Sequence, residues 1–133
     1  MPKIKNLMSH YVDAESQILI GDNLKLLKIN DEYIPFLSET KLLESFPNVV
    51  VDMGAVKFMC NGANVMRPGI KNYSDFLKDD IVCVVEESQN KFLAVGKAEM
   101  SSKEAESVNK GEVIKSMHYI SDEFWESKKE IKD

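Results

Sequence analysis

Short apolar runs bounded by turn-forming residues recur along this chain of 133 residues. Early in the chain the runs ILI, LKLLKI and YIPFL are separated by Gly-Asp-Asn and Asn-Asp, which are turn signals between strands. We therefore expect a β-meander there, with Pro35 at an edge strand or a strand end because proline lacks the N–H that a sheet requires. The chain opens with a polar, helix-compatible stretch, and SETKLLESFP predicts a short helix that Ser38 caps and Pro47 ends.

The same alternation of apolar runs and turns continues beyond Pro47. VVVD predicts a buried strand, and Asp52 is placed to cap a short helix over about Gly54–Cys60 that Gly62 stops. ANVMRPGI predicts a loop that leads into a strand, with Pro68-Gly69 as a turn pair. YSDFLKDD is typical of a single helical turn followed by a polar turn.

The remaining segment predicts a hairpin, a polar helix and a last strand. DIVCVVEES and KFLAVGKAEM flank a turn at residues 88–90. SSKEAESVNKG carries the capping-box pair Ser101 and Glu104 and has Gly111 as its stop. EVIKSMHYI is the last strand, SDEFWE a closing turn and SKKEIKD a charged, frayed tail. Many short strands with little helix favour a barrel-like, mainly β (α+β) fold over a layered α/β sheet.

Charge and composition narrow the functional classes. The net charge of −5 weighs against non-specific binding to polyanions, which requires many Lys and Arg contacts to phosphates, so a nucleic-acid site has to rest on local residues. No apolar run approaches the roughly 20 residues of a membrane-spanning helix. The first residues lack the apolar core and cleavage site of a secretory signal. We expect a soluble, cytoplasmic protein that does not contact a membrane.

The residues do not suggest a catalytic or metal-binding constellation. Cys60 and Cys83 lie far apart in apolar settings typical of free, packed thiols, and the two histidines fall in unrelated segments. A Gly-x-Ser-x-Gly elbow and a phosphate loop are both missing. A Cys60 nucleophile with His118 as its base is disfavoured, because nothing visible would lower the pKa of the thiol. We expect no catalysis, no metal and no cofactor.

In one segment, NGANVMRPG, the choice of residues exceeds what the fold alone requires. Three small or turn-forming residues follow the predicted helix, so a ligand could approach backbone N–H groups closely. Arg67 could read a phosphate or stack on a base. The structural alternative stays open, in which Gly62 only stops the helix and the Pro-Gly pair only makes a turn. Likewise, His118 and Tyr119 on the last strand are also explained if one packs inside and the other faces solvent.

The stretch VVVDMGAVKFMCNGANVMRPGI, residues 49–70, resembles the opening of a PUA domain. The matching features are a strand that ends in Asp52, then Gly54-Ala55, Gly62-Ala63 and the Pro-Gly-Ile at 68–70. VNKG and MHYISDEFW are more specific and resemble the T-cell-malignancy-associated family and its archaeal relatives, which carry a small pre-PUA domain. The resemblance implies an α/β pre-PUA segment over residues 1–47, a PUA pseudo-barrel over 48–126 and a charged tail over 127–133.

The resemblance implies that such domains bind structured RNA in a groove. This groove lies between the first helix, the glycine loop and the last strand. Carried over, the expected RNA-binding residues are Lys57, Gly62, Ala63, Asn64, Val65, Met66 and Arg67, with Lys97, Lys115, Met117 and His118. Basic residues are sparse around this groove, so modest, partner-dependent affinity is expected. The pre-PUA segment is also shorter than in eukaryotic members, which puts partner contacts there in doubt.

These implications favour a non-catalytic RNA-binding adaptor that contacts tRNA or ribosomal RNA in translation, with a translation factor or ribosomal subunit as a possible protein partner. The alternative is a protein-interaction module with a weakened RNA groove, which the acidic balance and the shortage of aromatic residues in the loop support. An enzyme is least favoured, because only about 48 residues precede the PUA segment.

Overall fold

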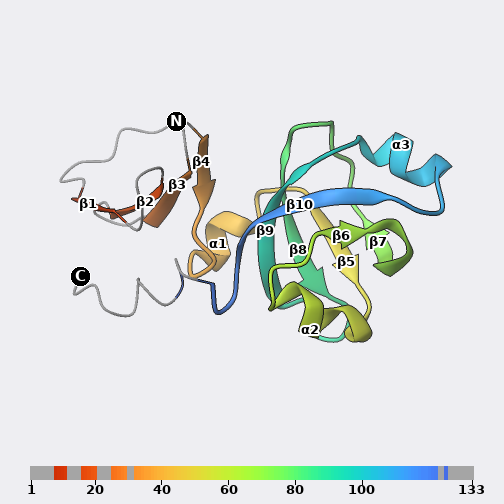
Figure 1. Ribbon diagram of the computed structural model, residues 1–133, viewed down its shortest axis with the longest axis horizontal. Helices are drawn as coiled ribbons and strands as arrows, with labels where there is room; N and C mark the ends of the chain where they lie inside the picture. Colours follow the sequence, from red (N-terminus) through yellow and green to blue (C-terminus); the bar gives the residue numbers. More distant parts are fainter. Residues whose placement is uncertain (1–7, 12–15, 21–24, 30–31, 123–124, 126–133) are drawn as a thin grey trace.

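The structure is a computed structural model that describes residues 8–11, 16–20, 25–29, 32–122 and 125. Figure 1 shows two sheets side by side, an N-terminal sheet and a barrel. The N-terminal sheet is antiparallel in the order β1-β2-β3-β4, with bounds Met8–Tyr11, Ser16–Ile20, Lys25–Ile29 and Glu32–Pro35. The meander is confirmed, and Pro35 ends the edge strand β4 as expected. The helix-compatible opening is wrong where it is described, because residues 8–11 pair with β2 as a strand.

The linker between the two sheets contains α1 (Thr40–Leu43). A short helix was predicted here, and it is confirmed. Its cap is not, because the N-cap is Glu39 and no side chain caps the helix. Leu43 is the buried residue of this helix, and the chain then turns at 44–46 before Pro47.

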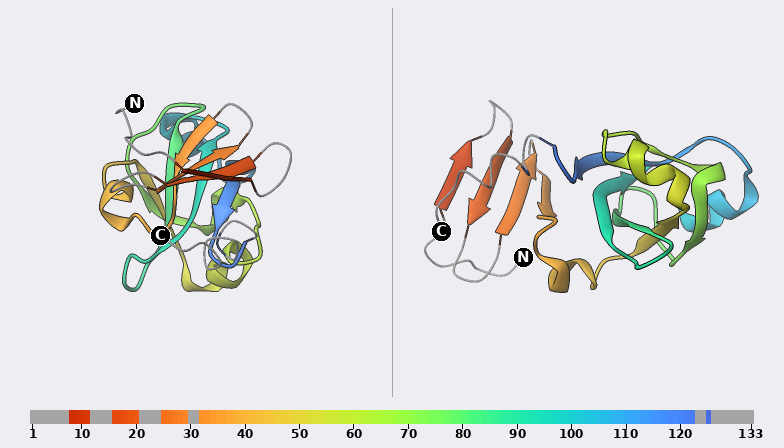
Figure 2. Two further views of the ribbon diagram at one scale, coloured as in Figure 1. Left: turned by 90° about the vertical axis from the view of Figure 1, so that its left-hand side faces the viewer. Right: turned by 90° about the horizontal axis from the view of Figure 1, so that it is seen from below.

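The barrel is a sheet in the order β6-β10-β9-β8-β5-β7 within the described part of the chain. Only β5 and β8 run parallel among these pairs. The two edge strands β6 and β7 are joined by the single 3-10 turn η2, so the sheet nearly closes on itself, as the end view in Figure 2 shows. The bounds are β5 Asn48–Val51, β6 Val65–Met66, η2 Arg67–Gly69, β7 Ile70–Tyr73, β8 Ile81–Glu86, β9 Phe92–Ala98 and β10 Glu112–Tyr119. The mainly β, barrel-like fold class is confirmed.

The β8–β9 hairpin is confirmed, and a carboxylate organises its turn. Glu86 accepts hydrogen bonds from the Ser88 hydroxyl (2.6 Å) and from the Gln89 and Lys91 backbone N–H groups (2.5 and 3.4 Å). These donors, led by Ser88, hold the pKa of Glu86 below its ordinary value. The helical turn expected before β8 is wrong, because residues 74–77 are irregular and Leu77 N–H is held by the Asp80 carboxylate at 2.9 Å.

The polar helix α3 (Ser102–Ser107) is confirmed with its cap, since the Ser101 hydroxyl accepts from the Glu104 N–H at 3.2 Å. Gly111 is not its stop. The helix ends four residues earlier because Val108 is extended, and Gly111, at φ +106°, instead leads into β10.

Two apolar clusters hold the fold. The barrel cluster lies inside the six-stranded sheet and includes Val49, Val84, Ala94 and Ile114. The seam cluster lies where the N-terminal sheet meets the barrel and includes Leu27, Ile34, Phe36 and, from the barrel, Cys83 and Val95. In the described residues no helix is long and apolar enough to cross a membrane.

Both cysteines are free. Cys83 is fully buried, and desolvation raises the pKa of its thiol to about 12, which suits the inert thiol expected from the sequence. Cys60 is only partly buried and packs against the barrel cluster.

Candidate functional site

A short capped turn and helix build one wall of the candidate site. Asp52 Oδ1 accepts from the Ala55 N–H at 2.9 Å and thereby caps the 3-10 turn η1 (Met53–Ala55), which runs into α2 (Val56–Met59). The predicted cap is therefore confirmed. Met59 faces the barrel core, whereas Phe58 is 60% exposed. Such exposure of a large aromatic side chain on a four-residue helix leaves a flat apolar surface facing water.

The glycine loop that follows is fixed by the backbone. Gly62 N–H donates to Met59 O (3.1 Å) and Ala63 N–H donates to Phe58 O (3.0 Å), the paired bonds of a Schellman motif. Gly62 has a φ of +86°, and a Cβ there would lie 2.9 Å from the Tyr119 ring. The predicted helix stop is confirmed, and glycine is required here for both conformation and space.

Asn64 fastens the loop to the last strand. Its Nδ2 donates to Glu112 Oε1 at 2.7 Å, and its Oδ1 accepts from the Ser116 N–H at 2.9 Å. Glu112 also shares a hydrogen bond with Glu99. That bond, together with burial, raises the pKa of Glu99, whereas the bonds from Glu99 and Asn64 lower the pKa of Glu112. Asn64 thus positions the loop through its whole side-chain amide.

An apolar hollow of about 300 Å³, the α2 groove, lies beside this loop. Phe58 and Met66, which is 48% exposed, are its most exposed lining side chains. The residues that line it are Val51, Ala55, Phe58, Met59, Ala63, Asn64, Val65, Met66 and Gly69. The structure therefore brings four predicted residues, those at 63–66, into one groove. Phe58 was missed, although an aromatic residue within a short capped helix was a usable signal.

Arg67 is not a free cation at this groove. Its Nε donates to Ala105 O of α3 at 2.6 Å, and its guanidinium lies 5.9 Å from the centre of the Tyr73 ring. Its backbone N–H donates to Gly111 O at 2.8 Å. Arg67 therefore ties α3 to the η2 turn, a role that the sequence pattern did not indicate. Lys57, by contrast, is exposed on α2 next to Phe58.

Lys97 and Lys115 lie in a second hollow of about 330 Å³ that shares no lining residue with the α2 groove. They are register partners on β9 and β10, and Lys78, Asp79, Ala98 and Glu99 complete the lining. Lys97 is ion-paired with Glu32 of β4, which raises the pKa of Lys97. Acidic side chains therefore accompany these lysines.

Met117 and His118 lie on the seam side of β10 and not in the α2 groove. Met117 packs against the seam cluster, and His118 is fully buried. The register with β9 shifts between Ser116 and His118, a bulge that changes which way the following side chains point. The prediction that His118 lines the RNA-binding groove is therefore wrong, because its side chain is fully buried.

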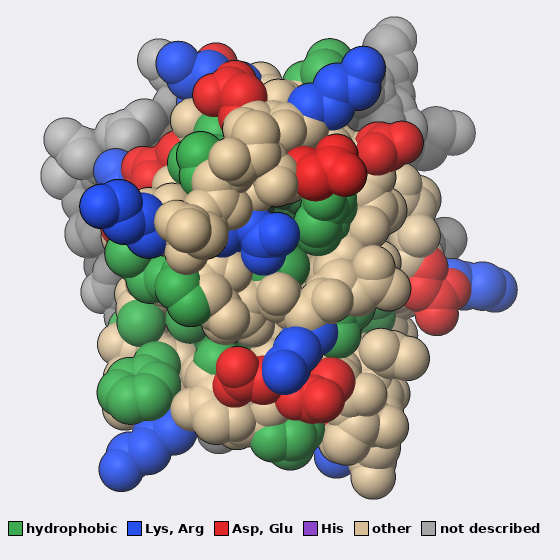
Figure 3. Space-filling view, turned by 90° about the vertical axis from the view of Figure 1, so that its right-hand side faces the viewer, with side chains coloured by type: hydrophobic (Ala, Val, Ile, Leu, Met, Phe, Trp, Pro, Cys, Tyr) green, Lys and Arg blue, Asp and Glu red, His purple; other side chains and the backbone are tan. Residues whose placement is uncertain are grey.

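Basic side chains do not form a continuous surface at the end of the molecule that carries α3, β6 and β7. In Figure 3 the Lys and Arg side chains on that face alternate with Asp and Glu side chains. This alternation of charges agrees with the net charge of −5. Lys57 is exposed and precedes Phe58 directly in the sequence.

Comparisons with known proteins agree with this geometry. The chain matches the PUA domain family over residues 47–120. It is 40% identical to an uncharacterized protein of Methanocaldococcus jannaschii (84% of this chain, 76% of that protein) and 33% identical to translation machinery-associated protein 20 of Saccharomyces cerevisiae (93% and 80%). The crystal structure of a hypothetical protein from Pyrococcus horikoshii superposes with a TM-score of 0.80 at 31% identity, covering 91% of this chain and 78% of that one. The family match covers more than half of the sequence and all six strands of the barrel sheet, so this protein belongs to the PUA domain family.

Proposed function

We propose that this protein binds RNA at the α2 groove and acts in translation as a non-catalytic adaptor. The PUA family to which the chain belongs is, by the resemblance described above, a family of RNA-binding modules. The yeast relative, 33% identical over most of the chain, is named for its association with the translation machinery. Together they favour tRNA or ribosomal RNA as the ligand class.

The proposal rests on an exposed aromatic side chain at the edge of an apolar hollow. Phe58 is 60% exposed beside a groove of about 300 Å³ whose floor is apolar. An aromatic ring that faces water offers a surface on which an unpaired base can stack. Lys57 adjoins the ring in sequence and is exposed, so it is available to a phosphate. We infer that the groove takes an unpaired segment of a structured RNA.

The test is binding to unfractionated tRNA and to purified small ribosomal subunits as a function of salt. Phe58→Ala is expected to weaken binding about tenfold or more, because stacking on one base contributes on the order of 1–3 kcal/mol. Lys57→Ala should weaken binding less and lower the salt slope by about one. Arg67→Ala is unsuitable, because it would release α3.

Matched controls are available outside the groove. Tyr33 is an aromatic residue 45% exposed on β4, and Lys41 is an exposed lysine on α1. Tyr33→Ala and Lys41→Ala should leave RNA binding unchanged. Equal losses in the control and groove variants would refute the assignment of the site.

The apolar lining also favours a second candidate, a protein-interaction module. In that case a protein partner would be retained through Phe58 at physiological salt, while RNA would be absent from the complex. Recovery of RNA by crosslinking in cell extract, lost in the Phe58→Ala variant, would decide for the RNA-binding role.

A further inference from the structure

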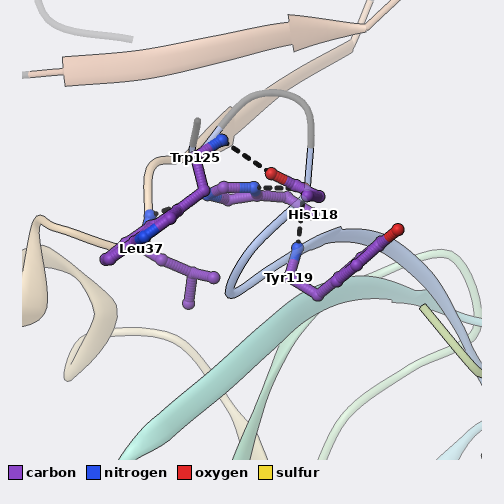
Figure 4. Close-up of polar contacts among 5 residues, drawn as sticks. Leu37, His118, Tyr119 and Trp125 are labelled. Atoms are coloured by element: carbon purple, nitrogen blue, oxygen red, sulfur yellow. Dashed lines mark hydrogen bonds and ion pairs between the residues drawn. The ribbon is translucent and has the colours of Figure 1, made fainter. Parts of the chain in front are cut away.

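A buried histidine joins the N-terminal sheet to the barrel. Leu37 lies just after β4, and its backbone N–H donates to His118 Nε2 at 3.1 Å, across 81 residues of sequence. The other ring nitrogen, Nδ1, lies 2.7 Å from Asp122 Oδ2. Figure 4 shows the ring between the linker residue Leu37 and the turn that follows β10. Both His118 and Asp122 are buried, at 0% and 4% exposed.

This geometry specifies one protonation state. A backbone N–H only donates, so Nε2 must be the unprotonated nitrogen, and Nδ1–H donates to the carboxylate. Asp122 is itself oriented by two more donors, the N–H groups of Tyr119 (2.8 Å) and Trp125 (2.7 Å). The ring is therefore held as a neutral imidazole between a fixed acceptor and a fixed donor.

The surroundings of the ring are mostly apolar. Phe36 lies against it, with ring centres 4.6 Å apart, and Val95 is its register partner on β9. Among charged groups, Asp122 faces it from the closing turn, Glu39 belongs to the linker, and Lys97 lies two residues beyond Val95 in an ion pair with Glu32.

The nearby Cys83 thiol does not titrate in the same range. It belongs to the seam cluster, and burial raises its pKa to about 12, so it stays neutral. Histidine is the type of side chain that ordinarily changes charge between neutral and mildly acidic pH.

We propose that His118 is a pH-sensitive latch between the two sheets. A proton on Nε2 would point an N–H at the Leu37 N–H, so the hydrogen bond that joins linker to barrel is lost. The Asp122 contact survives protonation, because Nδ1–H still donates to the carboxylate. Acid therefore frees the linker side of the ring while the barrel side holds. The linker loses this polar attachment to the barrel, whereas the ion pair between Lys97 of β9 and Glu32 of β4 remains. This inference does not depend on RNA binding.

The experiment is NMR on the full chain at about pH 7.5 and about pH 5.5. The protection factor of the Leu37 amide, corrected for intrinsic exchange, is expected to fall about tenfold or more as the imidazole nitrogen signals report Nε2 protonation. The Val84 amide in the barrel should keep its protection. A Leu37 protection factor that stays constant while Nε2 becomes protonated would overturn the proposal, and so would a ring that remains neutral at the acidic end.

Two variants test the same mechanism. In His118→Gln the carboxamide oxygen is able to accept from Leu37 while its NH₂ donates to Asp122, so Leu37 protection should become independent of pH. This variant also assigns the ring signals, since the chain has two histidines. Asp122→Asn removes the charge that favours an imidazolium, so loss of Leu37 protection should move to lower pH. If His118→Gln does not fold, the wild-type titration still decides.

Discussion

The barrel cluster and the seam cluster are both buried, but they differ in the interactions that hold them together. The barrel cluster consists of apolar side chains such as Val49, Val84 and Ile114, each 1% exposed or less. The seam cluster surrounds the buried polar pair His118 and Asp122, whose hydrogen bonds reach the linker and the closing turn. Apolar burial is strong but non-directional, whereas a satisfied polar network fixes one geometry. The barrel therefore supplies stability, and the seam supplies the position of one sheet on the other.

The largest loss is expected from a cavity in the barrel. Ile114 is fully buried in β10, so Ile114→Ala should lower the free energy of unfolding by about 3–4 kcal/mol, from lost burial plus the cavity left behind. Chemical denaturation followed by circular dichroism would measure it. Amide protection should fall in both sheets together, because the barrel supports the whole fold. A loss below about 1 kcal/mol would mean that the barrel core repacks freely.

A smaller and more local loss is expected in the seam. Asp122→Ala removes the acceptor of three hydrogen bonds, from His118, Tyr119 and Trp125, and should cost about 2–3 kcal/mol. Hydrogen exchange should show the loss concentrated at Leu37 and Tyr119, with Val84 little affected. An equal rise of exchange in the barrel would show that the two clusters unfold as one cooperative unit.

The smallest loss is expected at the glycine loop. Gly62→Ala places a methyl group 2.9 Å from the Tyr119 ring at a φ of +86°, which should cost about 1–2 kcal/mol. Thermal unfolding would measure that cost. RNA affinity should fall in the same variant, because the loop forms part of the α2 groove. Gly111→Ala is a useful control, since its φ is also positive but nothing lies within 4 Å of the added Cβ.

The sequence predicted correctly the features that depend on residues close together in the chain. The turns between apolar runs located the strands, and Asp52 and Gly62 were read correctly because caps and stops act over three to five residues. The predictions were wrong where contacts between distant segments of the chain determine the role of a residue. Gly111 serves a strand instead of a helix, and Arg67 is engaged by Ala105, 38 residues away.

The candidate site shows the same division. Residues 63–66 were grouped correctly because one loop carries them, whereas His118 was placed in the groove through the family resemblance. The bulge after Ser116 changes the direction of the side chains that follow it on β10, and the hydrogen-bond partner Leu37 lies in a distant part of the chain. Neither feature leaves a pattern in the local sequence.

Amide chemical-shift mapping with unfractionated tRNA at physiological salt would show whether RNA binds at the α2 groove. Shifts are expected to be concentrated at residues 57–66, to keep these positions in Asp122→Ala, and to require about tenfold or more tRNA in Phe58→Ala. Shifts centred on Lys78, Lys97 and Lys115, or no shifts at all at saturating tRNA, would contradict RNA binding at the α2 groove.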